Sequence, residues 1–191
     1  MRIRLASEAD AAAVRDVYAP FVETTTISFE LVPPPVDEMA RRIAARRDTH
    51  PWLLVEDGAR ILGYAYAGPF SARPAYLWSV ETSVYVDESA QRQGVGRALY
   101  AALLGLLGAQ GYHRAFAGIA LPNPASVGLH EAMGFRPVGV YRGVGWKFGR
   151  WHDVGWWQQT LPGVGPDDLP EPPRQVGALA AGFLEALLHP T

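Results

Sequence analysis

The segment Trp78–Tyr100 constrains the fold more than any other part of the chain, because a strand pattern passes through a glycine-rich turn into a helix pattern. Apolar or β-branched residues alternate with polar ones over Trp78–Val86, which predicts a strand. From Val95 the apolar residues recur at the spacing of one helical face, which comprises Val95, Ala98, Leu99, Ala102, Leu103, Leu106 and Leu107. The turn between them, Gln91–Gly96, lets main chain approach a ligand closely. We therefore predict that the N–H groups of the helix start bind an anion, with Glu81 of the strand nearby.

Two other phosphate-binding loops do not fit this turn. The dinucleotide fingerprint requires a third Gly or Ala where this chain has Leu99, and an acidic residue about twenty positions later, where the chain is apolar or neutral. A P-loop requires Gly-Lys-Ser or Gly-Lys-Thr after four intervening residues, and neither follows Gly94. A plain strand–turn–helix connection stays open for the turn taken alone.

Composition favours one enzyme-sized domain. The 191 residues, 49% of them hydrophobic, suffice for one substantial core and make a second full domain unexpected. A net charge of -2 gives no reason to expect nucleic acid or an anionic membrane as partner. The absence of cysteine excludes disulfides and a cysteine nucleophile, and the five histidines lack the paired spacing of metal ligands. The N-terminus has no apolar signal core and no apolar run approaches a membrane span, so we expect a cytoplasmic protein.

The remaining periodicities predict a mixed α/β chain. We expect a helix opened by Ser7 with Val14, Val17, Tyr18 and Phe21 on its buried face. We expect a second helix carrying the i,i+4 pairs Asp37 with Arg41 and Glu38 with Arg42. The predicted strands are 2–5, 52–56, 61–68, 78–86, 114–120, 137–141 and 153–161, with helices from Val95 and Ala125.

The C-terminal part differs in composition. Residues 162–174 are rich in Pro, Gly and acidic residues and predict a linker. Residues 175–191 carry apolar residues at helical spacing and predict an amphipathic helix that docks in cis or across a dimer. The segment has no basic face, which argues against a membrane anchor.

Several motifs resemble one enzyme superfamily. QRQGVGR follows a VYV strand, and Asn123–Ser126 leads into His130–Phe135. The chain thereby resembles the GNAT superfamily of acyl-CoA-dependent N-acyltransferases and, more narrowly, the phosphinothricin and methionine-sulfoximine N-acetyltransferase family. The narrower resemblance rests on TTTISFE (24–30), YAYAGPF (64–70), RPAYLWSVETSVYV (73–86), LPNPASVGLHEAMGF (121–135) and WKFGRWHDVGWWQ (146–158). It implies an α/β (α+β) GNAT fold over residues 1–161: a single mixed, mostly antiparallel twisted sheet flanked by helices, with strands splayed at the acyl-CoA site.

The resemblance also implies acetyl-CoA as co-substrate, with no metal. Main-chain groups of the VYV segment are expected to bind the pantetheine arm, and the glycine turn to bind the pyrophosphate. For Ser126, capping of the short helix and contact with the cofactor are equally open. The residues predicted to contact acetyl-CoA are Val84, Tyr85, Val86, Arg92, Gln93, Gly94, Val95, Gly96, Arg97, Asn123 and Ser126.

Acyl transfer from a thioester to an amine requires that the amine lose a proton, that an oxyanion be stabilised and that the leaving thiolate be protonated. The resemblance makes Glu81 the general base, acting through water; a solvated or salt-bridged carboxylate is the alternative. His130 stands where many GNAT enzymes carry a tyrosine that protonates the thiolate. Imidazole titrates near neutral pH, so His130 as acid, second base, substrate-orienting group or merely buried side chain all stay open.

Substrate and assembly follow from the resemblance. Small amino acid analogues carry a carboxylate and a second polar group, which call for a forked donor and hydroxyls, and the predicted substrate-binding residues are Phe29, Arg73 and Tyr76. Ser71 stands where relatives that prefer phosphinothricin often have a lysine, which weighs against that herbicide as best substrate. The alternatives are acetylation of another primary amine, such as a protein N-terminus or polyamine, and a non-catalytic acyl-CoA-binding module. A homodimer is expected, with the aromatic-rich segment 146–157 as its apolar surface.

Overall fold

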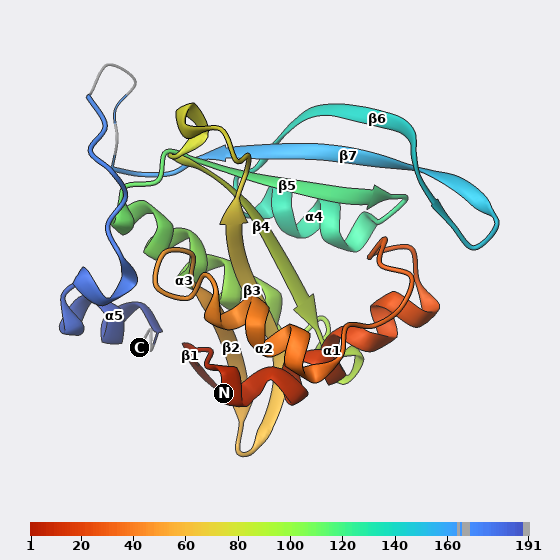
Figure 1. The fold of residues 1–191 in the computed structure, drawn as a ribbon, viewed down its shortest axis with the longest axis horizontal. Helices are drawn as coiled ribbons and strands as arrows, with labels where there is room; N and C mark the ends of the chain where they lie inside the picture. The colour runs from red at the N-terminus through yellow and green to blue at the C-terminus, as the bar shows by residue number, and fades with distance from the viewer. Residues whose placement is uncertain (164, 166–168, 189–191) are drawn as a thin grey trace.

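The computed structural model describes residues 1–163, 165 and 169–188. Its strands and helices follow one another as the ribbon in Figure 1 shows. The strands are β1 (Arg2–Leu5), β2 (Trp52–Asp57), β3 (Arg60–Pro69), β4 (Ser79–Val86), β5 (Arg114–Leu121), β6 (Arg136–Lys147) and β7 (Arg150–Thr160). The α-helices are α1 (Ala11–Thr24), α2 (Val36–Ala44), α3 (Val95–Gln110), α4 (Pro124–Ala132) and α5 (Ala181–Leu188), with short 3-10 helices η1 (Glu8–Asp10), η2 (Pro74–Tyr76), η3 (Glu88–Ala90) and η4 (Val176–Ala178).

These strands form one open sheet in the order β1-β2-β3-β4-β5-β7-β6. Neighbouring strands are antiparallel except β4 and β5, which run parallel. A parallel pair needs a crossover, and the segment that contains α3 supplies it. The predicted fold class, a mixed and mostly antiparallel sheet flanked by helices, is confirmed.

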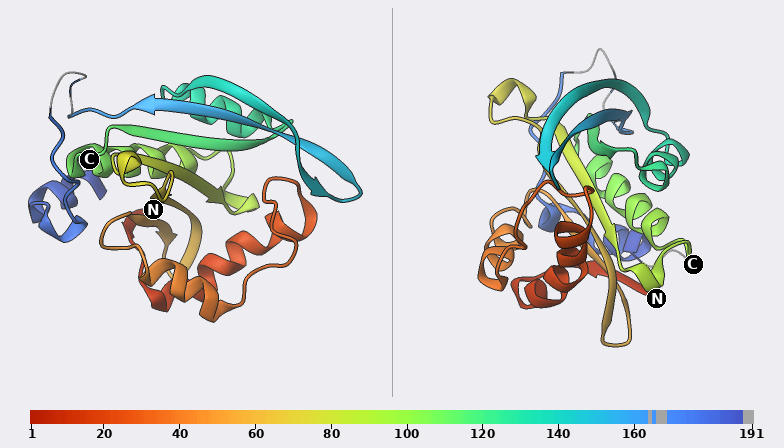
Figure 2. Two further views of the ribbon diagram at one scale, coloured as in Figure 1. Left: turned by 45° about the horizontal axis from the view of Figure 1, so that its top comes forward. Right: turned by 90° about the vertical axis from the view of Figure 1, so that its right-hand side faces the viewer.

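Helices cover both faces of the sheet, as the two views in Figure 2 show. Leu53 and Val55 of β2 belong to the core under α3, whereas Trp52 and Leu54 belong to the core under α1 and α2. Because both faces of β2 are buried, the strand begins with a continuous apolar run instead of an alternating one. The sheet therefore separates two hydrophobic cores, one under α3 and one under α1 and α2.

The N-terminal helices differ from the predictions in detail. The 3-10 turn η1 precedes α1, and its Asp10 carboxylate accepts hydrogen bonds from the Ser7 N–H at 2.8 Å and the Ser7 hydroxyl at 2.9 Å. In α2, Glu38 pairs with Arg42 as predicted, at 2.8 Å, but Arg41 also pairs with Glu38 and not with Asp37. On a helix surface, residues three and four apart are both neighbours, so the Glu38 carboxylate reaches Arg41 as readily as the Asp37 carboxylate does.

The later elements differ more. Strands β6 and β7 are longer than predicted and form a hairpin whose turn contains Phe148 and Gly149, both with positive φ. Ala98 is exposed, although the predicted apolar face of α3 included it. The predicted continuous C-terminal helix is replaced by η4 and α5, because Leu179 between them has extended backbone. Leu187 of α5 packs against Gly105 of α3, so the described part of the tail docks on its own chain; residues 189–191 of the predicted tail and 164 and 166–168 of the predicted linker lie outside the described residues.

Candidate functional site

Strands β4 and β5 separate partway along their length. They pair only at Ser79 with Arg114, Val80 with Ala115 and Glu81 with Phe116, although β4 continues to Val86. The Thr82 hydroxyl donates to the Phe116 carbonyl at 3.2 Å, at the point of divergence. Beyond it, the backbone groups of β4 that face β5 have no ladder partner in that strand. Such an edge offers hydrogen bonds to an extended ligand.

A cavity of about 560 Å³ lies where β4, the start of α3 and the start of α4 meet. Gly94 precedes α3 with a φ of +83°, a conformation that suits glycine, and the first N–H groups of α3 have no partner within the helix. A Cβ on Gly96 would lie 3.2 Å from the Leu129 side chain. The cavity is therefore narrow at the helix start, where the first N–H groups of α3 lie; that they bind an anion stays a prediction.

Most residues predicted to contact acetyl-CoA line this cavity. Gln93 does not: its side chain donates to the Ser89 carbonyl at 2.8 Å and borders a separate cavity with Met1. Two further residues line the main cavity: Gln91, which belongs to the predicted turn but was not predicted to contact the cofactor, and Leu129, which sequence reasoning did not single out. The predicted residues in its lining are Val84, Tyr85, Val86, Arg92, Gly94, Val95, Gly96, Arg97, Asn123 and Ser126.

A small cavity of about 40 Å³ lies in the wedge between β4 and β5. It shares Ile27, Val84, Tyr85, Asn123 and Ser126 with the larger cavity, so the two adjoin. Together they lead from the start of α3 to the last paired residues of β4. This shape fits a long ligand with an anionic end and a narrow arm.

Asn123 and Ser126 set the start of α4. The Asn123 side-chain oxygen accepts a hydrogen bond from the Ser126 N–H at 3.1 Å, so Asn123 is the N-cap and Ser126 is the residue that it caps. The capping role considered for Ser126 is therefore wrong. Its hydroxyl instead lies 3.3 Å from Nδ1 of His130.

His130 is buried on α4 with both ring nitrogens engaged. Its Nδ1 lies 2.7 Å from the Ser126 carbonyl, which can only accept, so Nδ1 carries the proton. Its Nε2 then accepts from the Tyr100 hydroxyl at 2.7 Å. Burial lowers the pKa of His130, so the ring is neutral near pH 7. Sequence analysis missed Tyr100, because a lone tyrosine in an apolar helix resembles a core residue.

Glu81 lies on the opposite face of β4 from Thr82, because successive side chains of a strand alternate. Tyr85 shares its face and contacts Tyr18 of α1, with ring centroids 4.9 Å apart, so this face lies toward α1 and α2. The Glu81 carboxylate is half-buried and forms no hydrogen bond or ion pair with the residues that the structure describes. Burial raises the pKa of Glu81.

The predicted substrate-binding residues are not gathered around Glu81 in this chain. Phe29 packs on β6, where a Cβ on Gly145 would lie only 2.1 Å from its ring. Lys147 holds the loop of Phe29 to the same hairpin by donating to the Val22 and Ser28 carbonyls at 2.6 and 2.7 Å. Arg73 and Tyr76 are exposed around η2, and neither lines the two cavities.

The described residues include no group of three or more His, Asp or Glu side chains placed to hold a metal ion. Within the same ranges, each helix is too short or too polar to cross a lipid bilayer.

Comparisons with known proteins agree with this geometry. Residues 3–156 match the family described as the acetyltransferase (GNAT) domain. The phosphinothricin N-acetyltransferase of Streptomyces viridochromogenes is 44% identical over 92% of this chain and 93% of its own. The L-methionine sulfoximine/L-methionine sulfone acetyltransferase of Pseudomonas paraeruginosa is 37% identical, over 83% and 94%. The crystal structure of a phosphinothricin acetyltransferase from Sinorhizobium meliloti in complex with acetyl-CoA has a TM-score of 0.84 and 33% identity, covering 88% of this chain and 92% of that one.

Proposed function

The chain belongs to the GNAT superfamily, in the family of phosphinothricin and methionine sulfoximine N-acetyltransferases, and from this premise we propose that it acetylates the α-amino group of a small amino acid analogue with Glu81 as general base. It is an acetyl-CoA-dependent N-acyltransferase. The observation that carries the finer proposal is that Glu81 is the last residue of β4 paired with β5, and that its carboxylate has no hydrogen-bond or ion-pair partner among the described residues.

Glu81 removes the proton of the amine. An α-amino group is mostly protonated at neutral pH and attacks only after it loses that proton. A carboxylate whose pKa is raised by burial, and which no cation neutralises, is a stronger base than an exposed one. In the absence of a direct contact, a water molecule relays the proton.

Groups at the edge and on the other face of β4 stabilise the oxyanion and protonate the leaving thiolate of CoA. Free N–H groups of the β4 edge stabilise the oxyanion of the tetrahedral intermediate. The thioester bond then breaks, and the Tyr100 hydroxyl, which lines the wedge cavity, gives up its hydrogen bond to His130 and donates its proton to the thiolate of CoA; water then returns a proton to Tyr100. His130 is a positioning residue in this scheme, because both its nitrogens are engaged and its Nε2 fixes the Tyr100 hydroxyl.

The substrate class rests on the relatives, which act on phosphinothricin, methionine sulfoximine and methionine sulfone. A homodimer is part of the proposal. The β6–β7 hairpin exposes large apolar side chains, and pairing of two subunits would remove this apolar surface from water. Tyr141, Trp146, Phe148 and Trp151 are 55 to 64% exposed.

Thiol release from acetyl-CoA tests the function. Methionine sulfone, methionine sulfoximine and phosphinothricin should give faster release than polyamines or peptides with free N-termini. Glu81→Gln keeps the size of the side chain and removes its basicity, so turnover should fall by about 10²- to 10⁴-fold. Calorimetric affinity for acetyl-CoA should be unchanged. Binding of acetyl-CoA without acetylation of any amine would identify a non-catalytic module instead.

A further inference from the structure

The segment that follows β7 returns to the domain at the end of α3. Residues 171–176, which we call the C-terminal strap, pass from Trp78 to the connection between α2 and β2, in the blue part of the ribbon in Figure 1. The strap lies outside residues 3–156, which match the acetyltransferase domain, and the site described above gives it no role. Val176 is 4% exposed, so the strap ends in the core of the domain.

The strap caps the C-terminal end of α3. The last carbonyl groups of a helix have no partner within the helix itself. Arg174 supplies partners for two of them: its main-chain N–H donates to the Gln110 carbonyl at 2.8 Å, and its Nη2 donates to the Ala109 carbonyl at 2.6 Å. The Arg174 cation also lies at the negative end of the helix dipole, which is favourable. These contacts attach the strap to α3 at one defined position.

Gln110 holds the strap with its side chain. The residue is 1% exposed, and its amide nitrogen donates to the Arg174 carbonyl and to the Thr49 carbonyl, each at 2.8 Å. Close by, the Val176 N–H donates to the Asp48 carbonyl at 2.8 Å. One buried amide therefore joins three segments that are far apart in the sequence: the end of α3, the strap, and the connection between α2 and β2.

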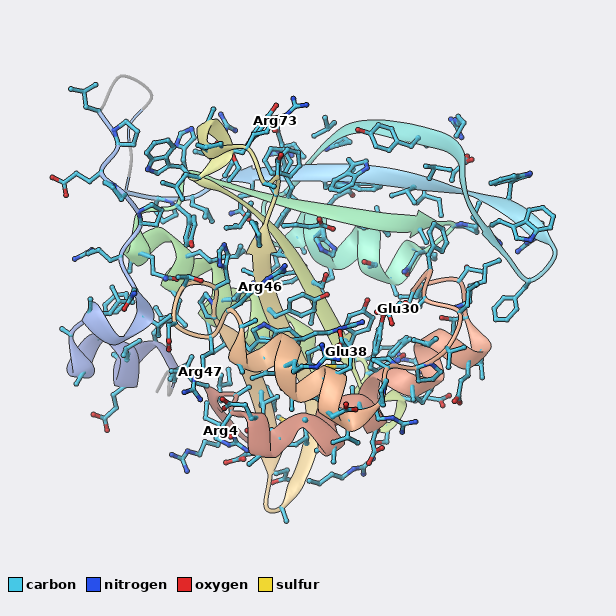
Figure 3. All side chains as sticks on the ribbon, in the orientation of Figure 1. Arg4, Glu30, Glu38, Arg46, Arg47 and Arg73 are labelled. Carbon is cyan, nitrogen blue, oxygen red and sulfur yellow. The ribbon has the colours of Figure 1, made fainter. Side chains whose placement is uncertain are left out.

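The strap also reaches the residue before β4. The Trp78 indole N–H donates to the Glu171 carbonyl at 2.8 Å. The Trp78 carbonyl in turn accepts from the N–H groups of His113 and Arg114, at 2.8 and 3.2 Å, where β5 begins. The loop before Trp78, on which Figure 3 labels Arg73, lies at the same end of the sheet. The strap is therefore bonded both to the beginning of β4 and, through the end of α3, to the segment that leads into β5.

This end of the sheet is the closed end of the wedge. There, Ser79–Glu81 of β4 pair with Arg114–Phe116 of β5, and beyond these three pairs the two strands diverge. Parallel pairing is slightly less stable per residue than antiparallel pairing, so a ladder this short depends on the contacts around it. Because Glu81 belongs to the last pair, its position relative to β5 is set by this ladder.

We propose that Gln110 and the C-terminal strap position Glu81 by holding the closed end of the wedge together. Gln110 is a positioning residue in this proposal, because it acts through the ladder and not on a substrate. When the strap is detached, the three pairs open more often and Glu81 moves relative to the acyl carbon. The start of α3 lies 16 residues from Gln110, about 24 Å along the helix, so the predicted anion site is not disturbed. The kinetic test of this inference rests on the proposed function, whereas its exchange test does not.

Hydrogen–deuterium exchange, read by NMR at single amides, tests the strap without turnover. Gln110→Met keeps the length of the side chain and removes the hydrogen bonds to Thr49 and Arg174. The amides of His113 and Arg114, which donate to the Trp78 carbonyl, should then exchange about 5-fold faster or more, the usual worth of a lost hydrogen bond.

Two controls accompany this measurement. The amide of Asp87, which is hydrogen-bonded at the other end of β4, should keep its exchange rate in Gln110→Met. Gln175→Met makes the same substitution at an exposed side chain of the strap, so it should leave the rates at His113 and Arg114 equal to those of wild type.

Single-turnover acetyl transfer to methionine sulfone tests the consequence for Glu81. Gln110→Met should lower this rate by about 10- to 10²-fold, because a misplacement of about 1 Å at a reacting group costs up to about 10²-fold. The calorimetric Kd for acetyl-CoA should stay that of wild type. Arg174→Met should lower the rate in the same way, and Arg174→Lys, which keeps a cation near the Ala109 carbonyl, should restore it.

The outcomes separate the two proposals. If wild type acetylates no amine, the proposed function fails, and the exchange rates still decide on the strap. Unchanged exchange at His113 and Arg114 in Gln110→Met overturns the role of the strap. Faster exchange at Asp87 as well, with a weaker Kd for acetyl-CoA, assigns Gln110 to general stability and overturns its positioning role, as does faster local exchange with an unchanged single-turnover rate. Should Gln110→Met not fold, Arg174→Met, at an exposed residue, decides by the same measurements.

Discussion

Replacing Gly145 by alanine should displace Phe29. A Cβ on Gly145 would lie 2.1, 2.5 and 2.7 Å from three atoms of the Phe29 ring, far inside van der Waals contact. The ring must move off the β6–β7 hairpin. Overpacking of this kind costs about 1–3 kcal/mol. For a chain of this length each kcal/mol lowers Tm by about 2–4 °C, so we expect a decrease of about 2–12 °C in a calorimetric melt.

The same strand supplies the control. Gly139 of β6 has nothing within 4 Å of its Cβ position, so Gly139→Ala introduces the same methyl group without a clash. Alanine loses less backbone entropy than glycine on folding, and Gly139→Ala should be neutral or stabilising by about 0.5–1 kcal/mol. Equal Tm values for the two variants would refute the contact with Phe29.

A double-mutant cycle isolates the contact. In a Phe29→Ala background the ring is absent, so the additional Gly145→Ala change should cost nothing in Tm. If Phe29 also borders the amine pocket, Gly145→Ala raises the KM for the amine and leaves that for acetyl-CoA unchanged. A change in both KM values would mean that the hairpin affects the whole site and that Phe29 has no selective role.

The remaining predictions concern the reaction and the assembly. Because burial raises the pKa of Glu81, kcat/KM should fall as pH drops through a value above the usual glutamate range, and this limb should vanish in Glu81→Gln. Because the pKa of Glu81 is raised in the folded state, ionisation of its carboxyl lowers the stability of the fold at pH values above the ordinary glutamate pKa. The Tm of Glu81→Gln at pH 7 should therefore be no lower than that of wild type. Tyr100→Phe should lower kcat by about 10²-fold or more, and His130→Gln, which still offers an acceptor, should lower it less; the reverse order in stopped-flow rates would make His130 the acid. Gly96→Val crowds the start of α3 against α4 and should weaken acetyl-CoA binding in calorimetry, where an unchanged Kd would contradict the anion site. Light scattering should give a dimer for wild type and a monomer for Trp151→Glu, and a monomeric wild type would reject the hairpin as an interface.

Local sequence patterns were enough to predict the three segments that line the cavity at the start of α3. The strand β4, the turn before α3 and the start of α4 are each encoded within a short segment, by alternation, glycine and an Asn-Pro cap. The family resemblance then placed these three segments around one ligand. Gln93 is the exception: it was predicted to contact the cofactor, but its side chain donates to the Ser89 carbonyl. Which of these two partners the side chain meets depends on its rotamer.

The surroundings of Phe29, which was predicted to bind the substrate, depend on contacts that no local pattern records. Phe29 and Gly145 meet because the loop after α1 lies against the hairpin, which Lys147 fixes through two carbonyl groups. The hairpin itself was underpredicted, since glycines in β6 interrupt the alternation that normally indicates a strand.

In the proposed mechanism, the divergence of β4 and β5 lets Glu81 act at the meeting point of two substrates. The cavity at the start of α3 and the wedge adjoin the strand edge, whereas α1 and α2 enclose space on the face of Glu81. In a continuous sheet these two sides would be separated by paired backbone. Because pairing stops at Glu81, the proposed mechanism puts its carboxylate at the first position where a group on one face could reach an acyl carbon that enters through the sheet. The lack of a counter-ion at Glu81 is costly for folding, and it is also what leaves the carboxylate free to take a proton.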